Sequence, residues 1–163
     1  MYKKIREVLP IVVIGLSMLI AITSILTVLK TSNDDAIMTG LTAIFGGEVA
    51  ALGSFASVDV NFSLFNFLAF YLPVIVALLI FFMGRKTKLE HFILFLLSVL
   101  LTATFIGSIV IIFNLGAYTQ GTATLLGIET TYTYEGAKLA LGSIISLILA
   151  ILGALSSGLL ALS

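Results

Sequence analysis

The sequence predicts an all-α membrane protein: a four-helix transmembrane bundle with a small extracytoplasmic β element from its two outer loops. The main observation is that four long stretches contain no Asp, Glu, Lys, Arg or His: Val8–Leu29, Val60–Gly84, Phe92–Ile128 and Leu139–Ser163. About 20 apolar residues in a helix cross the hydrocarbon core of a bilayer, so each stretch can hold one span. The chain has 163 residues, of which 60% are hydrophobic and 10% charged, which leaves room for one domain, 1–163.

The predicted spans cover residues 10–29, 64–83, 92–113 and 139–161, and the outer loops cover residues 30–63 and 114–138. The first span begins near Pro10, which is tolerated in a first helical turn because its missing N–H would be unpaired there. The second span contains Pro73 near its middle, which predicts a kinked helix.

Small residues recur every three or four positions along the last span. Such spacing lets helix backbones approach closely inside a membrane, where packing drives association. The pattern predicts a helix-packing face inside the bundle, with a homo-oligomer seam as the alternative. The residues of this face are Gly142, Ser146, Ala150, Gly153, Ala154 and Ser157.

Both outer loops carry signs of regular structure. In the first, Gly46 and Gly47 separate the apolar runs Thr39–Phe45 and Glu48–Phe55, which fits either a hairpin or a short interfacial helix. In the second, alternation predicts a strand over Ile128–Tyr134. A lone strand is unstable, so this strand should pair with the first loop. One face of the strand forms the predicted outer-loop surface: Ile128, Thr130, Tyr132 and Tyr134.

The charges predict how the protein lies in its membrane. Six of the eight basic residues precede the first span or lie between the second and third: Lys3, Lys4, Arg6, Arg85, Lys86 and Lys88. Basic residues collect on the cytoplasmic side of membrane proteins, so both termini should be cytoplasmic in a multi-pass plasma-membrane protein. The chain has no cysteine, and exported loops without a disulfide suit a bacterial membrane.

The order of several short motifs resembles that of small uncharacterised four-span membrane proteins of low-GC bacteria and mollicutes. These motifs are Thr39-Gly40, Phe45-Gly46 and Asn61–Asn66, followed by a span with Pro73 and a last span rich in small residues. The outline is also similar to claudin-type tetraspans, but the Trp and paired Cys of the claudin first loop are missing. Neither resemblance implies an activity or a functional residue.

Ionisable residues suggest no catalytic, cofactor-binding or metal site. His91 has only Glu90 and basic residues near it in the sequence, which is typical of a solvated side chain at the membrane interface. Asp34 and Asp35 could contribute oxygen ligands to a cation, although two adjacent carboxylates are more typical of a solvated turn.

The favoured function is therefore a structural or interaction protein, such as an accessory subunit that presents its outer loops to a partner. The expected partners are the lipid bilayer and either another protein or further copies of the chain, with no nucleic acid. The alternative is a channel-, holin- or transporter-type subunit that forms a pathway as an oligomer. A membrane enzyme acting on lipid is a third hypothesis.

Overall fold

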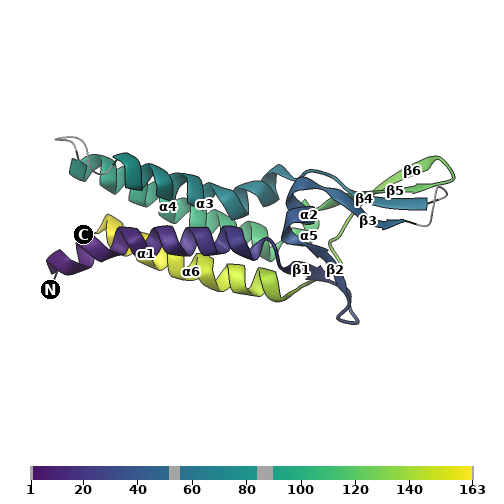
Figure 1. Cartoon of the computed structure of the whole chain (residues 1–163), viewed down its shortest axis with the longest axis horizontal. Helices are drawn as coiled ribbons and strands as arrows, with labels where there is room; N and C mark the ends of the chain where they lie inside the picture. The colour runs from purple at the N-terminus through teal and green to yellow at the C-terminus, as the bar shows by residue number, and fades with distance from the viewer. Residues whose placement is uncertain (1, 52–55, 84–89, 163) are drawn as a thin grey trace.

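The computed structural model describes residues 2–51, 56–83 and 90–162. Four long helices lie side by side at one end of the molecule, and two β sheets lie at the other (Figure 1). We call these the helical end and the sheet end; both chain termini lie at the helical end. The long helices are α1 (Tyr2–Thr23), α3 (Leu64–Met83), α4 (Glu90–Phe113) and α6 (Leu141–Ala161).

The fold is not all-α, so the predicted fold class was wrong. The described residues form six helices and seven strands, which build sheets of three and four strands. Within these residues three helices, not four, are long and apolar enough to cross a membrane: Leu64–Phe82, Phe92–Phe113 and Leu141–Ala161. The apolar part of α1, Val8–Thr23, is shorter, and α1 packs beside α3 and α6.

The predicted first span, 10–29, was too long at its C-terminal end. Helix α1 ends at Thr23, and the hydroxyls of Thr23 and Ser24 donate hydrogen bonds to backbone carbonyls three residues earlier. The next backbone amides also bond three residues back, as in a tightened last turn. Residues Thr27–Lys30 then form strand β1, whose two central residues are buried. A charge-free stretch does not distinguish a buried strand from a helix, which explains the error.

Strand β1 is the middle strand of the smaller sheet, which has the order β2-β1-β7 and is antiparallel. Strand β2 is Ala36–Thr39 and β7 is Lys138–Leu139. Ser143 Oγ, in the first turn of α6, donates a 2.7 Å hydrogen bond to the Val28 carbonyl oxygen. The last helix therefore begins at Leu141, after a strand that fixes its start to the sheet.

The larger sheet projects from the helices along roughly their own direction and ends in a free tip (Figure 1). Its strands, in spatial order and each antiparallel to the next, are β3 (Gly47–Ala51), β4 (Ala56–Val60), β5 (Gln120–Leu125) and β6 (Ile128–Thr133). The predicted strand at Ile128–Tyr134 corresponds to β6, but β6 pairs with β5 and not with the first loop. The first loop joins this sheet through β4, which pairs with β5 of the second loop. The predicted pairing of Ile128–Tyr134 with the first loop was therefore wrong.

The first loop contains both a helix and strands. The run Thr39–Phe45 forms helix α2 (Gly40–Phe45), and the side-chain oxygen of Thr39 accepts a hydrogen bond from the amide of Thr42 at its start. The described part of the second apolar run belongs to β3. Gly46 separates the two elements with φ +83°, and a Cβ there would lie 2.5 Å from the Val60 carbonyl oxygen, so the position requires glycine.

A layer of short elements connects the helices to the larger sheet. It contains α2 and α5 (Leu115–Tyr118), and Asn66 in the first turn of α3 links them. Asn66 is buried, and its Nδ2 donates hydrogen bonds of 2.9 Å to the Ala43 carbonyl and to Thr119 Oγ1. The sheet is thus held to the helices by buried hydrogen bonds.

Candidate functional site

The small residues predicted to form a packing face lie mostly inside the helical part. Five of the six are buried: Gly142, Ser146, Ala150, Gly153 and Ser157; Ala154 is half-buried. A Cβ on Gly153 would lie 2.4 Å from the ring of Phe105 on α4. A Cβ on Gly142 would lie 2.7 Å from the Thr27 carbonyl oxygen. Helix α6 therefore approaches both α4 and the β1 segment at positions where only glycine leaves enough room.

The hydroxyl groups between the helices bond to protein atoms. Thr23 Oγ1 and Ser146 Oγ lie 2.5 Å apart and join α1 to α6. Thr102 Oγ1 donates to Ser157 Oγ at 2.9 Å and joins α4 to α6. Ser108 Oγ donates to the Ala69 carbonyl at 2.7 Å and joins α4 to α3. These side chains hold helices together, which is the usual use of Ser and Thr in membrane helices.

The β5–β6 hairpin has a two-residue turn with an unusual sequence. Leu126 and Gly127 have φ values of +52° and +84°, as in a type I′ turn. Such turns favour Asn or Asp followed by Gly, whereas here a leucine takes the left-handed position. The ladder pairs Leu125 with Ile128 and runs without a register shift to the pair of Gln120 and Thr133.

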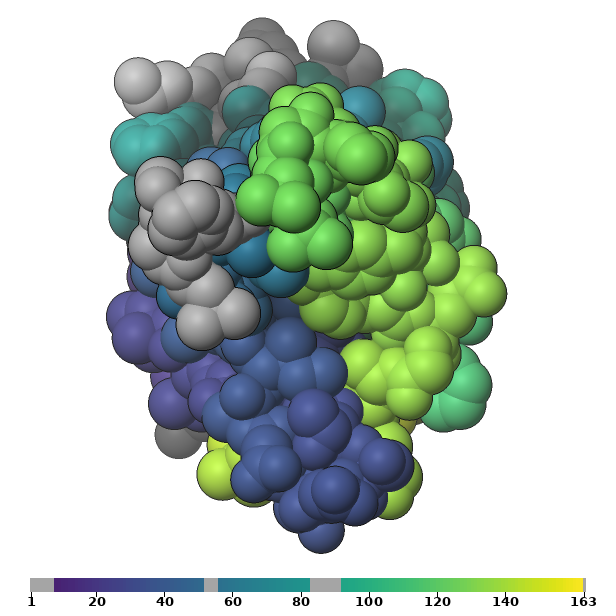
Figure 2. Space-filling view, turned by 90° about the vertical axis from the view of Figure 1, so that its right-hand side faces the viewer, coloured from purple at the N-terminus to yellow at the C-terminus, as the bar shows by residue number. Residues whose placement is uncertain are grey.

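The hairpin tip exposes three large apolar side chains. Leu125, Leu126 and Ile128 are 61%, 75% and 72% exposed. Figure 2, which looks onto the sheet end, shows the hairpin covering the upper part of this face and the smaller sheet with its connecting turn below it. The apolar tip therefore lies at the part of the molecule farthest from the helical end (Figure 1).

The four residues of the predicted outer-loop surface divide into two pairs. Ile128 and Thr130 are exposed, near the tip. Tyr132 and Tyr134 are half-buried; their rings lie 5.1 Å apart, and their hydroxyl oxygens are 2.9 Å apart. Burial, followed by the hydrogen bond with Tyr132, raises the pKa of Tyr134 well above its usual value, so its hydroxyl stays protonated. A Cβ on Gly121, the β5 partner of Tyr132, would lie 2.8 Å from the Tyr132 ring.

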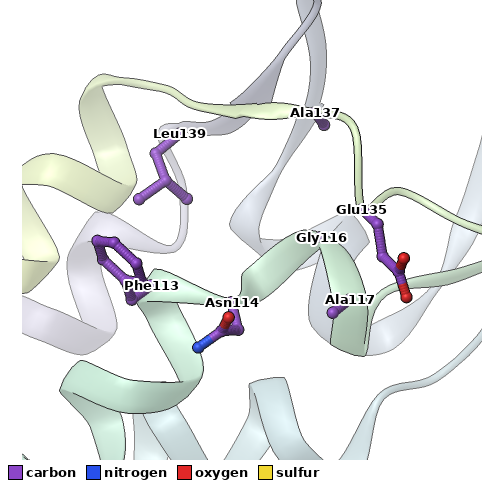
Figure 3. Close-up of a pocket in the computed structure, with 7 residues that line it drawn as sticks. All are labelled: Phe113, Asn114, Gly116, Ala117, Glu135, Ala137 and Leu139. Atoms are coloured by element: carbon purple, nitrogen blue, oxygen red, sulfur yellow. The ribbon is translucent and has the colours of Figure 1, made fainter.

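A pocket of about 310 Å³ lies at the base of the sheets, beside the C-terminal end of α4 (Figure 3). Glu135 is its one ionisable lining residue, and Figure 3 places it on the side away from Phe113 and Leu139. Asn114 directly follows α4, and its side-chain Nδ2 donates to the Val110 carbonyl in the last turn of that helix. The lining residues are Phe113, Asn114, Gly116, Ala117, Glu135, Ala137 and Leu139.

The carboxylates of the sheet end are dispersed. Asp34 forms a 2.7 Å ion pair with Lys30, and the hydrogen bond and charge of Lys30 lower the pKa of Asp34. Within the residues that the structure describes, no group of three His, Cys, Asp or Glu side chains could hold a metal ion. The side chain of His91 and the basic segment 84–89 lie outside the described part.

No family model matches the chain, and neither a curated protein nor a solved structure matches it. The geometry of the β5–β6 hairpin thus decides which site is the best candidate. The sequence pattern found β6 and its tyrosines but missed β5 and the turn. The signal it overlooked was the Leu126-Gly127 pair between two threonine-rich segments.

Proposed function

We propose that this chain is an integral membrane interaction protein, and not an enzyme, whose sheet end docks another protein. In this proposal α3, α4 and α6 cross the membrane, α1 lies beside them, and the protein acts as an accessory subunit. Three helices of sufficient length and apolarity support the membrane location.

The observation that carries the docking function is Leu126. It is 75% exposed and has a positive φ, so it gains little from burial and adopts a backbone conformation that leucine disfavours. Asn would suit the turn better, which means that folding does not account for leucine at this position. Positions where a sequence departs from local preferences are often functional. Together with exposed Leu125 and Ile128, Leu126 offers an apolar anchor of the kind that protein interfaces bury.

We further propose that the sheet end faces the outside of a plasma membrane, with bacterial origin the best fit to a chain without cysteine. The described sheet end contains two basic residues, Lys30 and Lys138. Acidic residues are more numerous there: Asp34, Asp35, Glu48, Asp59, Glu129 and Glu135. The other six basic residues precede Val8 or lie at 85–88, beyond the far end of α3. This division supports cytoplasmic termini.

The test replaces single residues by a photo-cross-linking amino acid in intact cells. The tip position is Leu126, and the control is Ile148, an exposed apolar residue on the middle of α6. Illumination should join Leu126 to a protein and give a discrete larger band, while Ile148 should give lipid adducts. A protein band absent at Leu126, or equally strong at Ile148, would contradict a docking role for the tip.

A further inference from the structure

Strand β6 has one open edge. In a two-residue hairpin, the residues that flank the turn exchange both of their backbone hydrogen bonds. Leu125 and Ile128 are that pair, so Ile128, Thr130 and Tyr132 direct their N–H and C=O groups toward β5. Glu129, Thr131 and Thr133 therefore direct theirs away from the sheet. In the described part of the chain, no strand pairs with β6 on that side.

This edge has only one of the features that usually prevent strands from pairing with another molecule, the charge of Glu129. Edge strands are commonly interrupted by bulges or carry Lys or Pro. The ladder of edge strand β3 has a register shift between Glu48 and Ala50, and β2 also pairs with shifts. By contrast, β6 is regular over six pairs and contains neither Lys nor Pro. Thr131 and Thr133 are exposed, and a hollow of about 300 Å³ lies beside them.

We propose that β6 pairs antiparallel with β6 of a second copy of this chain, centred on Thr131. In this register Thr131 faces Thr131 of the second copy, and Glu129 faces Thr133 in both directions. The three residues whose backbone N–H and C=O groups point away from β5, Glu129, Thr131 and Thr133, then all pair with the same three residues of the second copy. This gives about six new backbone hydrogen bonds. Centring on Glu129 would place two carboxylates opposite each other, which is unfavourable. Centring on Thr130 or Tyr132 would pair only two of the three outward residues within β6.

The side chains of the two copies also complement each other in this register. Thr130 faces Tyr132 of the second copy, and exposed Ile128 lies diagonally across from the same Tyr132. Pairs of aromatic and β-branched residues stabilise neighbouring strands, as do pairs of threonines such as the central one. The only carboxylate of β6, that of Glu129, meets the neutral hydroxyl of Thr133. A second copy therefore supplies a suitable neighbour for each outward position, which is why we favour it over an unrelated extended peptide.

The antiparallel arrangement determines where the two copies reside. The larger sheet projects along roughly the direction of the helices (Figure 1). A two-fold axis that relates antiparallel strands is perpendicular to them, so the helices of the two copies lie at opposite ends of the joined sheet. Copies in one membrane point the same way and cannot meet like this. The pairing would thus join two facing membranes, with the two Thr133 residues about 13 Å apart along the strands.

Disulfide formation between two vesicle populations tests this pairing, which rests on the proposed docking function of the sheet end. The native chain has no cysteine. Phosphatidylcholine vesicles carrying full-length Thr131→Cys protein with one tag are mixed with vesicles carrying the same variant with another tag. The central pair places the two Cα atoms about 5.5 Å apart, within reach of a disulfide. Mild oxidation should therefore yield dimers that contain both tags.

Two matched variants control for random collision. Thr122→Cys lies directly across from Thr131 on β5 and is half-buried. Glu129→Cys lies on the same edge, but its two copies would be about 13 Å apart in the proposed register. Neither should form dimers with both tags. Dimers at Thr131→Cys with only one tag, or equal dimer yields at all three positions, would overturn the proposal.

A charge exchange tests the same contact without a covalent bond. Vesicles carrying Thr131→Lys should not cluster by light scattering, and neither should vesicles carrying Thr131→Glu, because like charges then face each other. A mixture of the two should cluster as the native protein does. Thr131 is exposed, and the unfolding temperature of both variants should match the native value. The pairing would be overturned if vesicles carrying either variant alone clustered, or if vesicles carrying the native protein did not cluster.

The outcomes separate this inference from the docking function. Leu126 could cross-link to a protein in cells while vesicles carrying the native protein fail to cluster. This result would refute pairing between two copies of the chain, but it would still support docking of a different protein. Loss of the adducts would refute the docking function itself.

Discussion

Gly153 on α6 lies against the aromatic ring of Phe105 on α4. A Cβ there would lie 2.4 Å from Phe105, which is completely buried. We expect Gly153→Ala to destabilise the protein by about 1–3 kcal/mol, the usual cost of overpacking. Gly107 on α4 is the matched control because a Cβ there would meet nothing within 4 Å. Gly107→Ala should be neutral or stabilise by up to about 1 kcal/mol.

Thermal unfolding in mild detergent measures both glycine variants. The expected result is a lower unfolding temperature for Gly153→Ala and an unchanged or higher one for Gly107→Ala. Equal shifts would mean that α4 and α6 do not approach each other as closely as the Phe105 contact requires.

Asn66 provides a second prediction for a single residue. It is buried, and its Nδ2 bonds both to α2 and to Thr119, which follows α5. Asn66→Ala removes two buried hydrogen bonds and leaves the Ala43 carbonyl without this donor, which should cost about 1–3 kcal/mol. Asn114→Ala, which removes an exposed side chain bonded to the neighbouring last turn of α4, should change stability by less than about 0.5 kcal/mol. Comparable losses in thermal unfolding would argue against Asn66 as the link between sheet and helices.

For the β5–β6 hairpin, the turn residue can be changed without altering any strand. Leu126→Asn should stabilise the hairpin by about 1 kcal/mol because asparagine tolerates a positive φ. The amides of Thr130 and Tyr132, which face β5, should then exchange with deuterium about fivefold more slowly. The same variant should weaken docking, since the apolar side chain is lost. Faster exchange in Leu126→Asn would contradict the type I′ turn.

The elements that the sequence predicted well are those with a strong single signal. The predicted second span, 64–83, coincides with α3, because a proline inside a 20-residue apolar stretch does not prevent a helix there. The alternation in Ile128–Tyr134 located β6. By contrast, β5 lies within the charge-free stretch Phe92–Ile128. That stretch was interpreted as a membrane span followed by a loop, so the strand was missed.

The remaining errors concern which elements meet, and single-sequence patterns hold little information about that. Val28 and Leu29 are as apolar as any residue of a span, yet they form the centre of a three-stranded sheet. Strand β2 lies close to β1 in the sequence, whereas β7 lies more than 100 residues away. The residues of β1 themselves do not indicate that these two strands are its partners. The role of Asn66 was missed for the same reason, because its two partners come from other segments.

Taken as a whole, the molecule has distinct ends, and this asymmetry leads to a prediction about its orientation. Helix α3 starts at the sheet end, α4 runs back to it, and α6 runs away from it again (Figure 1). If these three helices cross a membrane, the sheets lie on one side of it and the C-terminus lies on the other. The basic residues at 85–88 come directly after α3 in the sequence, and α3 ends at the side opposite the sheets. Basic segments stay in the cytoplasm, so the sheets should lie outside.

Single cysteines in the cysteine-free chain measure this orientation directly. Ser32→Cys, in the exposed turn after β1, should react with a membrane-impermeant maleimide on intact cells. Thr87→Cys, within the basic segment, should react only after the cells are opened. Ser32 and Thr87 both carry a small polar hydroxyl side chain, so a difference in labelling reports the side of the membrane and not the polarity of the residue replaced. Labelling of Thr87→Cys on intact cells would reverse the orientation, place the acidic sheet end in the cytoplasm, and exclude any contact between facing outer membrane surfaces through β6.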